Sequence, residues 1–217
     1  MAGRDITRLM NEARSHLVGA TDNTIQLALF GVMDDFFRGS NAWQEDIDVQ
    51  VAGNEPAGTI YPLTPTGACL IDKLMWVFVA PASAQELRGT PVNAAMSVPG
   101  ELTLYSQPSS PAVYRATVAL TVSDPLTRDG NVIFPEWVLQ KYRAIILHGL
   151  LGRMMAQPNK PFSNLQLSVY HSRSFNSGIS TARVEVQRNN KYRAQAWRFP
   201  GFAGGSQKGG SGWAGPQ

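Results

Sequence analysis

The side chains able to do acid–base or metal chemistry in this chain of 217 residues are few and scattered. The histidines, His16, His148 and His171, share no spacing typical of metal ligands, and the single cysteine, Cys69, cannot complete a zinc set. His148 lies inside an apolar helical pattern and is interpreted as a packed core residue. Cys69 lies in an apolar run, which is typical of a small buried hydrophobe rather than a reactive thiol. No metal site is therefore expected.

The carboxylates form no obvious catalytic pair. Asp34 and Asp35 are adjacent, so their side chains diverge on a helix. Asp46 and Asp48 could share one face of a strand, but nothing basic lies near them in the sequence. The sequence has no G-x-S-x-G elbow and no Walker loop, and the run GGSQK at 204–208 lies in a glycine-rich terminal segment rather than between a strand and a helix. We therefore expect no catalytic residues, no cofactor and no enzymatic activity.

The chain is organised around two helices predicted on either side of a proline-rich corner at 158–162. Pro135 suits the first helical position, and the proline that opens the corner ends this helix, which is predicted over 135–157. Ser163 is a good N-cap for the second helix, over 163–190. The second helix has one apolar face, made by Phe175, Ile179, Ala182 and Val186.

A third helix is predicted near the N-terminus, over 22–38. Asp22 is the predicted N-cap, and Gly39 is placed to end the helix in a left-handed conformation. Residues 5–18 show a shorter amphipathic pattern with weak start and stop signals. One side of the 22–38 helix is apolar and can pack against the C-terminal pair: Ile25, Leu29, Val32, Met33 and Phe36.

Between these helices the apolar period changes from that of a helix to that of a strand. A loop rich in Ala, Pro and Ser is predicted over 80–99. Strands are predicted at 47–51, 60–63, 69–79, 102–104 and 114–122. The fold class is therefore predicted as α+β: a helical bundle of one N-terminal and two long C-terminal helices, with an inserted antiparallel β-rich domain and an extended C-terminal tail. The corresponding domains are 1–42 with 134–190 for the bundle, 43–133 for the β-rich domain, and 191–217 for the tail.

Charge is distributed unevenly along the chain. Residues 1–134 carry 8 Lys/Arg against 14 Asp/Glu, a balance of −6, and residues 135–217 carry 11 against 2, a balance of +9, which sum to the net +3. Such a split suggests that the two ends face different partners. No apolar run is long enough to span a bilayer, and the N-terminus lacks the apolar region of a secretory signal. A single cysteine suits a reducing cytoplasm, and no membrane association is expected.

The predicted tail, 191–217, contains seven glycines and too few aliphatic residues to build a core. We expect it to be disordered alone and to order on a partner, with its aromatic rings as anchors and its arginines as charged contacts. The candidate docking residues are Tyr192, Arg193, Trp197, Arg198, Phe199, Phe202 and Trp213. A plain disordered terminus is the alternative interpretation.

Several runs resemble the head-to-tail adaptor proteins of short-tailed bacteriophages, the connector components related to tail tubular protein A. The first run is GATD at 19–22 with FRGSNAW at 37–43 and EDIDV at 45–49. The second is LTLY at 102–105 with the alternating strand that leads to VSDP at 122–125. The third is MMAQPNKPFSN at 154–164, continued by Tyr170, Arg173, Phe175, Gly178, Ile179, Ala182 and Arg183. The resemblance covers roughly residues 16–190, and departs from the family at Phe162, at 80–99 and in the tail.

The resemblance implies a structural role in the neck of a virion, with the protein made in the host cytoplasm. Family members form dodecameric rings between the portal protein and the tail, around a channel that DNA traverses without specific recognition. The implied partners are other copies of the chain, the portal protein, and a tail nozzle or tail tube protein. The C-terminal segment 191–217 is the implied portal-docking element.

Two alternatives remain open at this point. A nearer one is another neck or tail ring component of similar fold. One from a different class is a nucleic-acid-binding module that uses the basic C-terminal third, although that third contains no recognition motif and no strand-borne array of aromatic residues.

Overall fold

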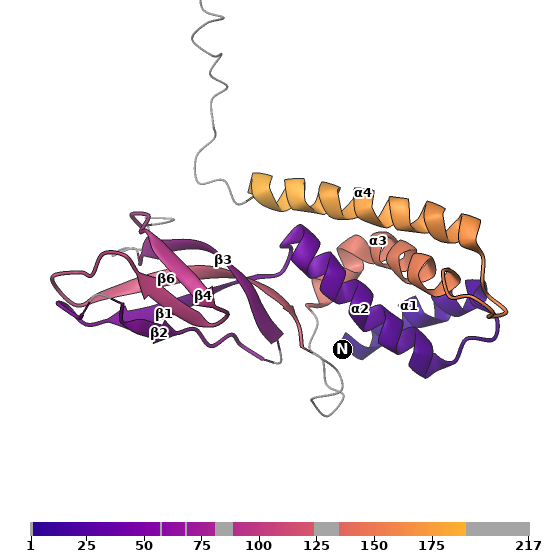
Figure 1. Cartoon of the computed structure of the whole chain (residues 1–217), viewed down its shortest axis with the longest axis horizontal. Coiled ribbons are helices and arrows are strands. Elements are labelled where there is room, and N and C mark those ends of the chain that lie inside the picture. Colours follow the sequence, from indigo (N-terminus) through magenta and orange to yellow (C-terminus); the bar gives the residue numbers. More distant parts are fainter. Residues whose placement is uncertain (1, 57, 68, 81–88, 124–134, 190–217) are drawn as a thin grey trace, which may run out of the picture.

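The computed structural model describes residues 2–56, 58–67, 69–80, 89–123 and 135–189. The described residues form four helices and six strands. In Figure 1 the strands fill the left half of the molecule and the helices the right half, and α4 lies along α3 with its C-terminal end nearest the strands. The helices are α1 (Ala2–His16), α2 (Asp22–Ser40), α3 (Glu136–Met155) and α4 (Leu165–Asn189).

The six strands form two small antiparallel sheets. They are β1 (Gln44–Val51), β2 (Ile60–Pro62), β3 (Cys69–Val79), β4 (Ala94–Val98), β5 (Glu101–Leu104) and β6 (Ala112–Val122). Sheet A has the order β1-β6-β3 and sheet B the order β2-β5-β4. In sheet A the central strand β6 pairs with two strands that precede it by many residues, so the sheet is built from non-local contacts.

The predicted architecture of the fold is wrong. The chain is α+β, but it has two helices before the strands and two after them, instead of a bundle of one N-terminal and two long C-terminal helices. The strands form two separate three-stranded sheets. The segment 2–16 was underestimated because its local start and stop signals are weak. It is helical because Leu9, Ala13 and Leu17 are buried in the core shared with the other helices.

The predicted loop at 80–99 is also wrong in part, because it contains β4, which pairs with β5. Residues 94–98, of sequence AAMSV, have little intrinsic preference for a strand and take that conformation from their partner.

The helix ends lie close to the predicted positions but use different capping residues. Thr21 rather than Asp22 is the N-cap of α2 and accepts a hydrogen bond from the Thr24 N–H at 3.4 Å. Asn41 (φ 54°) rather than Gly39 takes the left-handed conformation after α2, which an Asn side chain tolerates. Asn164 rather than Ser163 accepts the first-turn N–H of α4, from Leu167 at 3.1 Å.

Two apolar cores hold the parts together. One lies among the four helices and contains, besides the predicted face of α2, the side chains of Ile146, Leu150 and Met154 from α3. The other lies between the two sheets and includes Cys69, which is buried as predicted. Trp43 contacts both cores, so it links the end of α2 with the start of β1.

Helices α3 and α4 pack closely through glycines. A Cβ at Gly149 would lie 2.8 Å from Phe175 Cδ2, and a Cβ at Gly152 would lie 2.8 Å from Ser172 Oγ. These glycines therefore permit the close approach of the two helices. Ala156, in contrast, is the exposed C-cap of α3.

Candidate interaction surfaces

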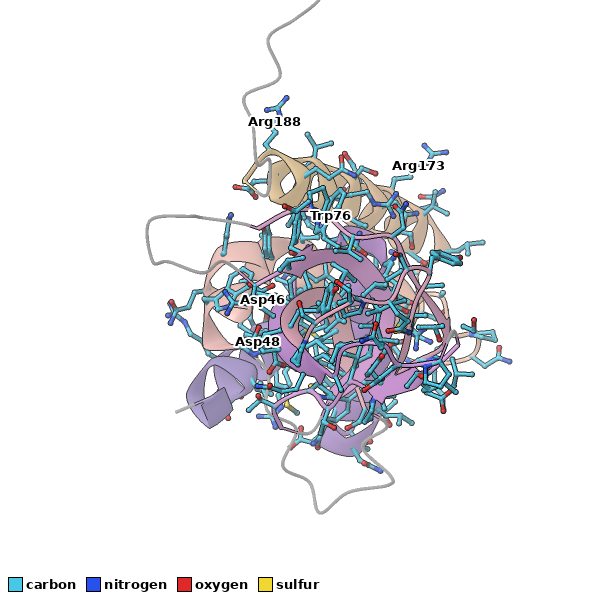
Figure 2. All side chains as sticks on the ribbon, turned by 90° about the vertical axis from the view of Figure 1, so that its left-hand side faces the viewer. Asp46, Asp48, Trp76, Arg173 and Arg188 are labelled. Carbon is cyan, nitrogen blue, oxygen red and sulfur yellow. The ribbon has the colours of Figure 1, made fainter. Side chains whose placement is uncertain are left out.

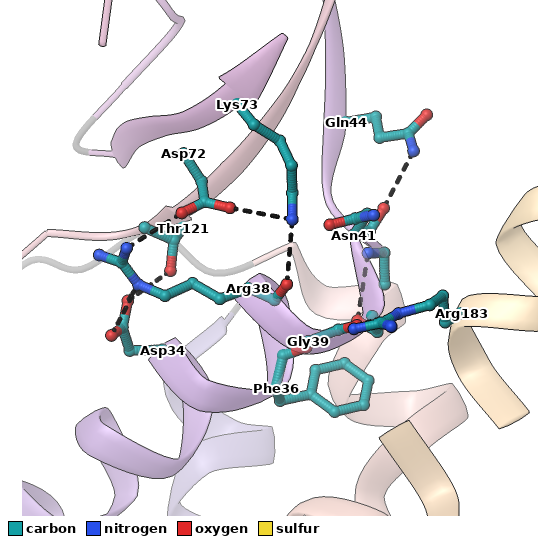
Figure 3. A network of polar contacts seen from close by, with 12 residues as sticks. Asp34, Phe36, Arg38, Gly39, Asn41, Gln44, Asp72, Lys73, Thr121 and Arg183 are labelled. Carbon is teal, nitrogen blue, oxygen red and sulfur yellow. Dashed lines mark hydrogen bonds and ion pairs between the residues drawn. The ribbon is translucent and has the colours of Figure 1, made fainter. Parts of the chain in front are cut away.

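A polar junction joins the C-terminal end of α2 to the strands and to α4 (Figure 3). The last four carbonyls of a helix lack intrahelical partners, and three of the four that end α2 accept hydrogen bonds here. The Phe37 carbonyl accepts from the Asn41 N–H at 2.9 Å. The Arg38 carbonyl accepts from Lys73 Nζ at 3.3 Å, and the Gly39 carbonyl from Arg183 Nε at 2.6 Å. Two of the three donors are cations at the negative end of the helix dipole, a favourable placement.

Ion pairs extend the junction from α2 into sheet A. Arg38 Nε contacts both oxygens of Asp34, at 2.9 and 3.0 Å, and Arg38 Nη1 contacts Asp72 on β3 at 3.0 Å. Thr121 on β6 donates its hydroxyl to Asp34 at 2.6 Å. The hydrogen bond that Arg38 donates to Asp34, reinforced by the charges of the neighbouring carboxylates, raises the pKa of Arg38. Because side chains from α2, β3 and β6 share one network, the helices and sheet A are held in one orientation (Figure 3).

The charges left without an ion-pair partner segregate between the two parts of the described structure. Among the described side chains, the carboxylates with no cation within ion-pair distance all lie in the strands and their loops: Glu45, Asp46, Glu55 and Glu101. Cations with no carboxylate partner among the described residues all lie in the helices and their connections: Arg8, Lys160, Arg173, Arg183 and Arg188. The other described carboxylates and cations whose side chains are placed form ion pairs. The charge asymmetry of the sequence therefore becomes an asymmetry between the two ends of the structure.

The outward side of α4 is composed like an interface. Residues spaced three or four apart form the α4 outer stripe, in which every side chain is exposed: Tyr170, Arg173, Ser177, Ser180, Val184 and Arg188. Tyr170 is 59% exposed and Val184 is 44% exposed. The only carboxylate on α4, Glu185, is occupied by Lys141 Nζ at 2.7 Å. Tyr and Arg are enriched and acidic residues depleted at protein interfaces, as they are on this stripe.

The outer face of sheet A carries an exposed tryptophan beside carboxylates (Figure 2). Asp46, Thr117 and Trp76 stand in one row across β1, β6 and β3, so their side chains share a face. Thr117 donates its hydroxyl to Asp46 at 2.6 Å, and Trp76 is 48% exposed. In the next row Asp48 accepts two hydrogen bonds from Arg115, at 2.7 and 2.9 Å, and these lower the pKa of Asp48. Arg115 is thus paired with Asp48, and Asp46, whose charge also acts on Arg115, has no cation within ion-pair distance among the described residues.

The structure brings together two histidines that the sequence does not connect. Nδ1 of His148 on α3 lies 2.7 Å from Nδ1 of His171 on α4, so one ring donates and the other accepts. The ring of Tyr170 packs edge-on against both imidazoles. Burial, followed by the positive charges of His148 and His16, lowers the pKa of His171. The core interpretation of His148 is therefore incomplete: its half-buried ring is one member of a hydrogen-bonded pair.

The remaining expectations about sites fall on different parts of the chain. The predicted docking residues Tyr192, Arg193, Trp197, Arg198, Phe199, Phe202 and Trp213 all lie outside the described residues. Within the described ranges no group of three or more His, Cys, Asp or Glu side chains is placed to hold a metal ion. Among the four described helices, none combines the length and apolar character that crossing a membrane requires.

Neither exposed surface was predicted as a unit from the sequence. Asp46 and Asp48 were recognised as possible neighbours on a strand, but Trp76 and Arg115 reach them only through the pairing of β6 with β1 and β3. The α4 outer stripe has a visible signal, the three- and four-residue spacing of residues opposite the buried face. No protein-family model matches this chain, and a search of curated proteins found no match.

Proposed function

We propose that this chain is a structural ring subunit of the head-to-tail connector of a short-tailed bacteriophage, placed in the neck of the virion between the portal protein and the tail. In this proposal it does no catalysis and takes no cofactor. It joins other copies of itself, binds the portal protein through residues 191–217, and meets a tail nozzle or tail tube protein. DNA passes through the ring without sequence-specific recognition.

One observation carries the proposal: segments of the runs that suggest this family lie against each other in the fold. Gly19, in the first run, approaches Pro161, in the third, so that a Cβ at Gly19 would be 3.5 Å from Pro161 Cγ. The strand at 45–49 from the first run pairs along its length with β6 from the second. Runs that are distant in sequence but adjacent in space are what a shared fold would require, so their adjacency supports the resemblance.

The polar junction gives the proposal a mechanical basis. A connector subunit must hold its partners at fixed positions relative to each other, so its helices and its strands need a fixed relative orientation. Arg38 joins α2 to β3, and Arg183 joins α4 to the end of α2. The two parts then present different charge to partners at opposite ends of the molecule (Figure 1).

The proposal is tested by size-exclusion chromatography with light scattering, on the chain alone and with the portal protein of the same phage. We expect a ring-sized assembly, alone or on the portal. A monomer that binds no portal protein would refute the proposal. Salt-sensitive DNA binding without portal binding would instead favour the nucleic-acid-binding alternative.

The docking role of the C-terminal segment has its own test. A chain that ends at Asn190 is expected to keep its fold and lose portal binding, because the cores described above lie before that residue. Trp197→Ala is expected to weaken portal binding about 30-fold or more if that ring is a buried anchor. Trp137→Ala, which removes a half-exposed ring on α3, is the matched control and is expected to leave binding unchanged. Full portal binding by the truncated chain would contradict this role.

A further inference from the structure

The α4 outer stripe and the outer face of sheet A are complementary in chemistry. The stripe offers two guanidinium groups, Arg173 and Arg188, that have no carboxylate partner among the described residues. The sheet offers Asp46, which has no ion-pair partner among the described residues, with Trp76 in the same row. A guanidinium pairs with a carboxylate or stacks on the face of an indole, so each of these two groups is a suitable partner for an arginine of the stripe.

The two surfaces also match in size. From Tyr170 to Arg188 the stripe is about 27 Å long at 1.5 Å per residue. Strand β1 has eight residues, which corresponds to about 26 Å at 3.3 Å per residue. Ser177 and Ser180 in the middle of the stripe are small, so a flat sheet surface can approach the helix closely there.

One copy of the chain cannot satisfy both surfaces, because they face different directions. In Figure 2 Arg173 and Arg188 project from the upper margin of the molecule, whereas Asp46 and Asp48 lie lower, in its left half. We propose that the α4 outer stripe of one copy binds the outer face of sheet A of a second copy. Since each copy then presents a different surface to each neighbour, the contact is heterologous and repeats around a ring or along a filament.

This inference deepens the proposed function, because it rests on self-association and names the surfaces that perform it. The composition of the stripe favours protein over DNA as the occupant. Phosphate-binding surfaces are dominated by cations and polar groups, whereas this stripe also exposes the apolar side chain of Val184. An apolar and arginine-bearing face opposite a tryptophan and a carboxylate is the arrangement of a protein interface.

The experiment compares the full natural chain with two full-length variants in which side chains are shortened to alanine. Arg173→Ala/Arg188→Ala removes the cations of the stripe, and Trp76→Ala removes the ring of the sheet. Sedimentation velocity over a range of protein concentrations is expected to show that each variant associates at least about tenfold more weakly than the natural chain. The matched controls are Arg8→Ala, an exposed cation elsewhere, and Trp137→Ala, whose ring is 47% exposed against 48% for Trp76. Both controls are expected to associate normally.

Mixing the two variants tests the heterologous pairing itself. At a concentration where each variant alone is monomeric, an equimolar mixture is expected to have the mass of a dimer, because one intact stripe and one intact sheet face remain. A mixture that stays monomeric, variants that assemble like the natural chain, or a natural chain that is monomeric at every concentration would each overturn the inference. Unfolding midpoints in urea establish that the variants are folded, and Trp76→Gln provides a milder change if Trp76→Ala is not.

Portal binding, measured in parallel, separates the two proposals. If the natural chain forms rings or binds portal protein and the variants do the same, the proposed function stands and this interface is overturned. If the natural chain associates but never binds portal protein, and the variants fail to associate, the interface is supported and the connector function is overturned.

Discussion

Gly152→Leu tests how closely α3 and α4 approach each other. A Cβ at this position would lie 2.8 Å from Ser172 Oγ and 3.0 Å from the Ser172 backbone nitrogen. The hydroxyl can rotate away, but the backbone of α4 cannot, so the two helices must separate by a few tenths of an ångström. The leucine side chain then brings three more carbon atoms into the same space. The separation also stretches the buried hydrogen bond that Ser168 Oγ donates to the Gly152 carbonyl at 2.8 Å.

These contributions have opposite signs and can be compared. Overpacking a close contact costs about 1–3 kcal/mol, and loss of a neutral hydrogen bond costs about 1 kcal/mol. The higher helix propensity of leucine returns less than about 1 kcal/mol. We therefore expect the free energy of unfolding to fall by about 1–3 kcal/mol, since the last two terms roughly cancel.

Urea denaturation followed by circular dichroism measures this change. With a slope of about 1–3 kcal/mol per M, the midpoint is expected to fall by about 1 M. Ala156→Leu is the matched control, because Ala156 is exposed one turn further along α3, and its effect is expected within about 0.5 kcal/mol of zero. An unchanged midpoint for Gly152→Leu, at an unchanged slope, would refute the close approach of the helices.

The remaining predictions concern the junction and the histidine pair. Asn41→Val is expected to destabilise the protein by about 1–2 kcal/mol in urea denaturation, because a β-branched residue resists the left-handed conformation, whereas Asn41→Gly is expected to be neutral or better. Arg183→Met, which keeps the apolar stem but leaves the Gly39 carbonyl without its donor, is expected to cost about 1–3 kcal/mol in the same assay, and a cost near zero would contradict the cap. Because the pKa of His171 is lowered in the folded protein, the unfolded chain binds the proton more readily, so stability is expected to fall as pH drops below about 6.5, the ordinary histidine pKa. His171→Gln is expected to flatten this pH dependence, and a wild-type stability that rises on acidification from pH 7 to 5.5 would contradict the sign.

Local sequence patterns were sufficient to predict the ends of α3 and the buried face of α4. Proline disrupts a helix interior, so Pro135 and the corner at 158–162 set the two ends of α3 whatever the helix packs against. The alternation along β6 predicts one buried and one outward face, but the structure shows it only near the start of the strand, because every residue from Ala116 to Val122 is buried. The stripe of Phe175, Ile179, Ala182 and Val186 faces the helical core as predicted.

Two elements, α1 and β4, are stabilised mainly by contacts with other segments, and their local sequence signals are weak. Helix α1 has weak end signals and depends on burial of Leu9 and Leu17. Strand β4 has a poor intrinsic preference and depends on pairing with β5. The number of helices and the division of the strands into two sheets were therefore mispredicted. Packing against distant segments stabilises these elements more than the small differences in intrinsic propensity between residues oppose them.

Only the tertiary structure decided which side chains meet. His148 and His171 are nearly equidistant from the corner at 158–161, and two antiparallel helices joined by a short corner bring such positions opposite each other. Arg115 reaches Asp48 from a distance of 67 positions because β6 pairs with β1 in one particular register. The sequence by itself determined the periodicity of each segment and its breaks, since these arise from steric and hydrogen-bonding properties of neighbouring residues. Register and helix pairing arise from burial between segments far apart in the chain, and these placed the charges, the exposed Trp76 and the histidine pair.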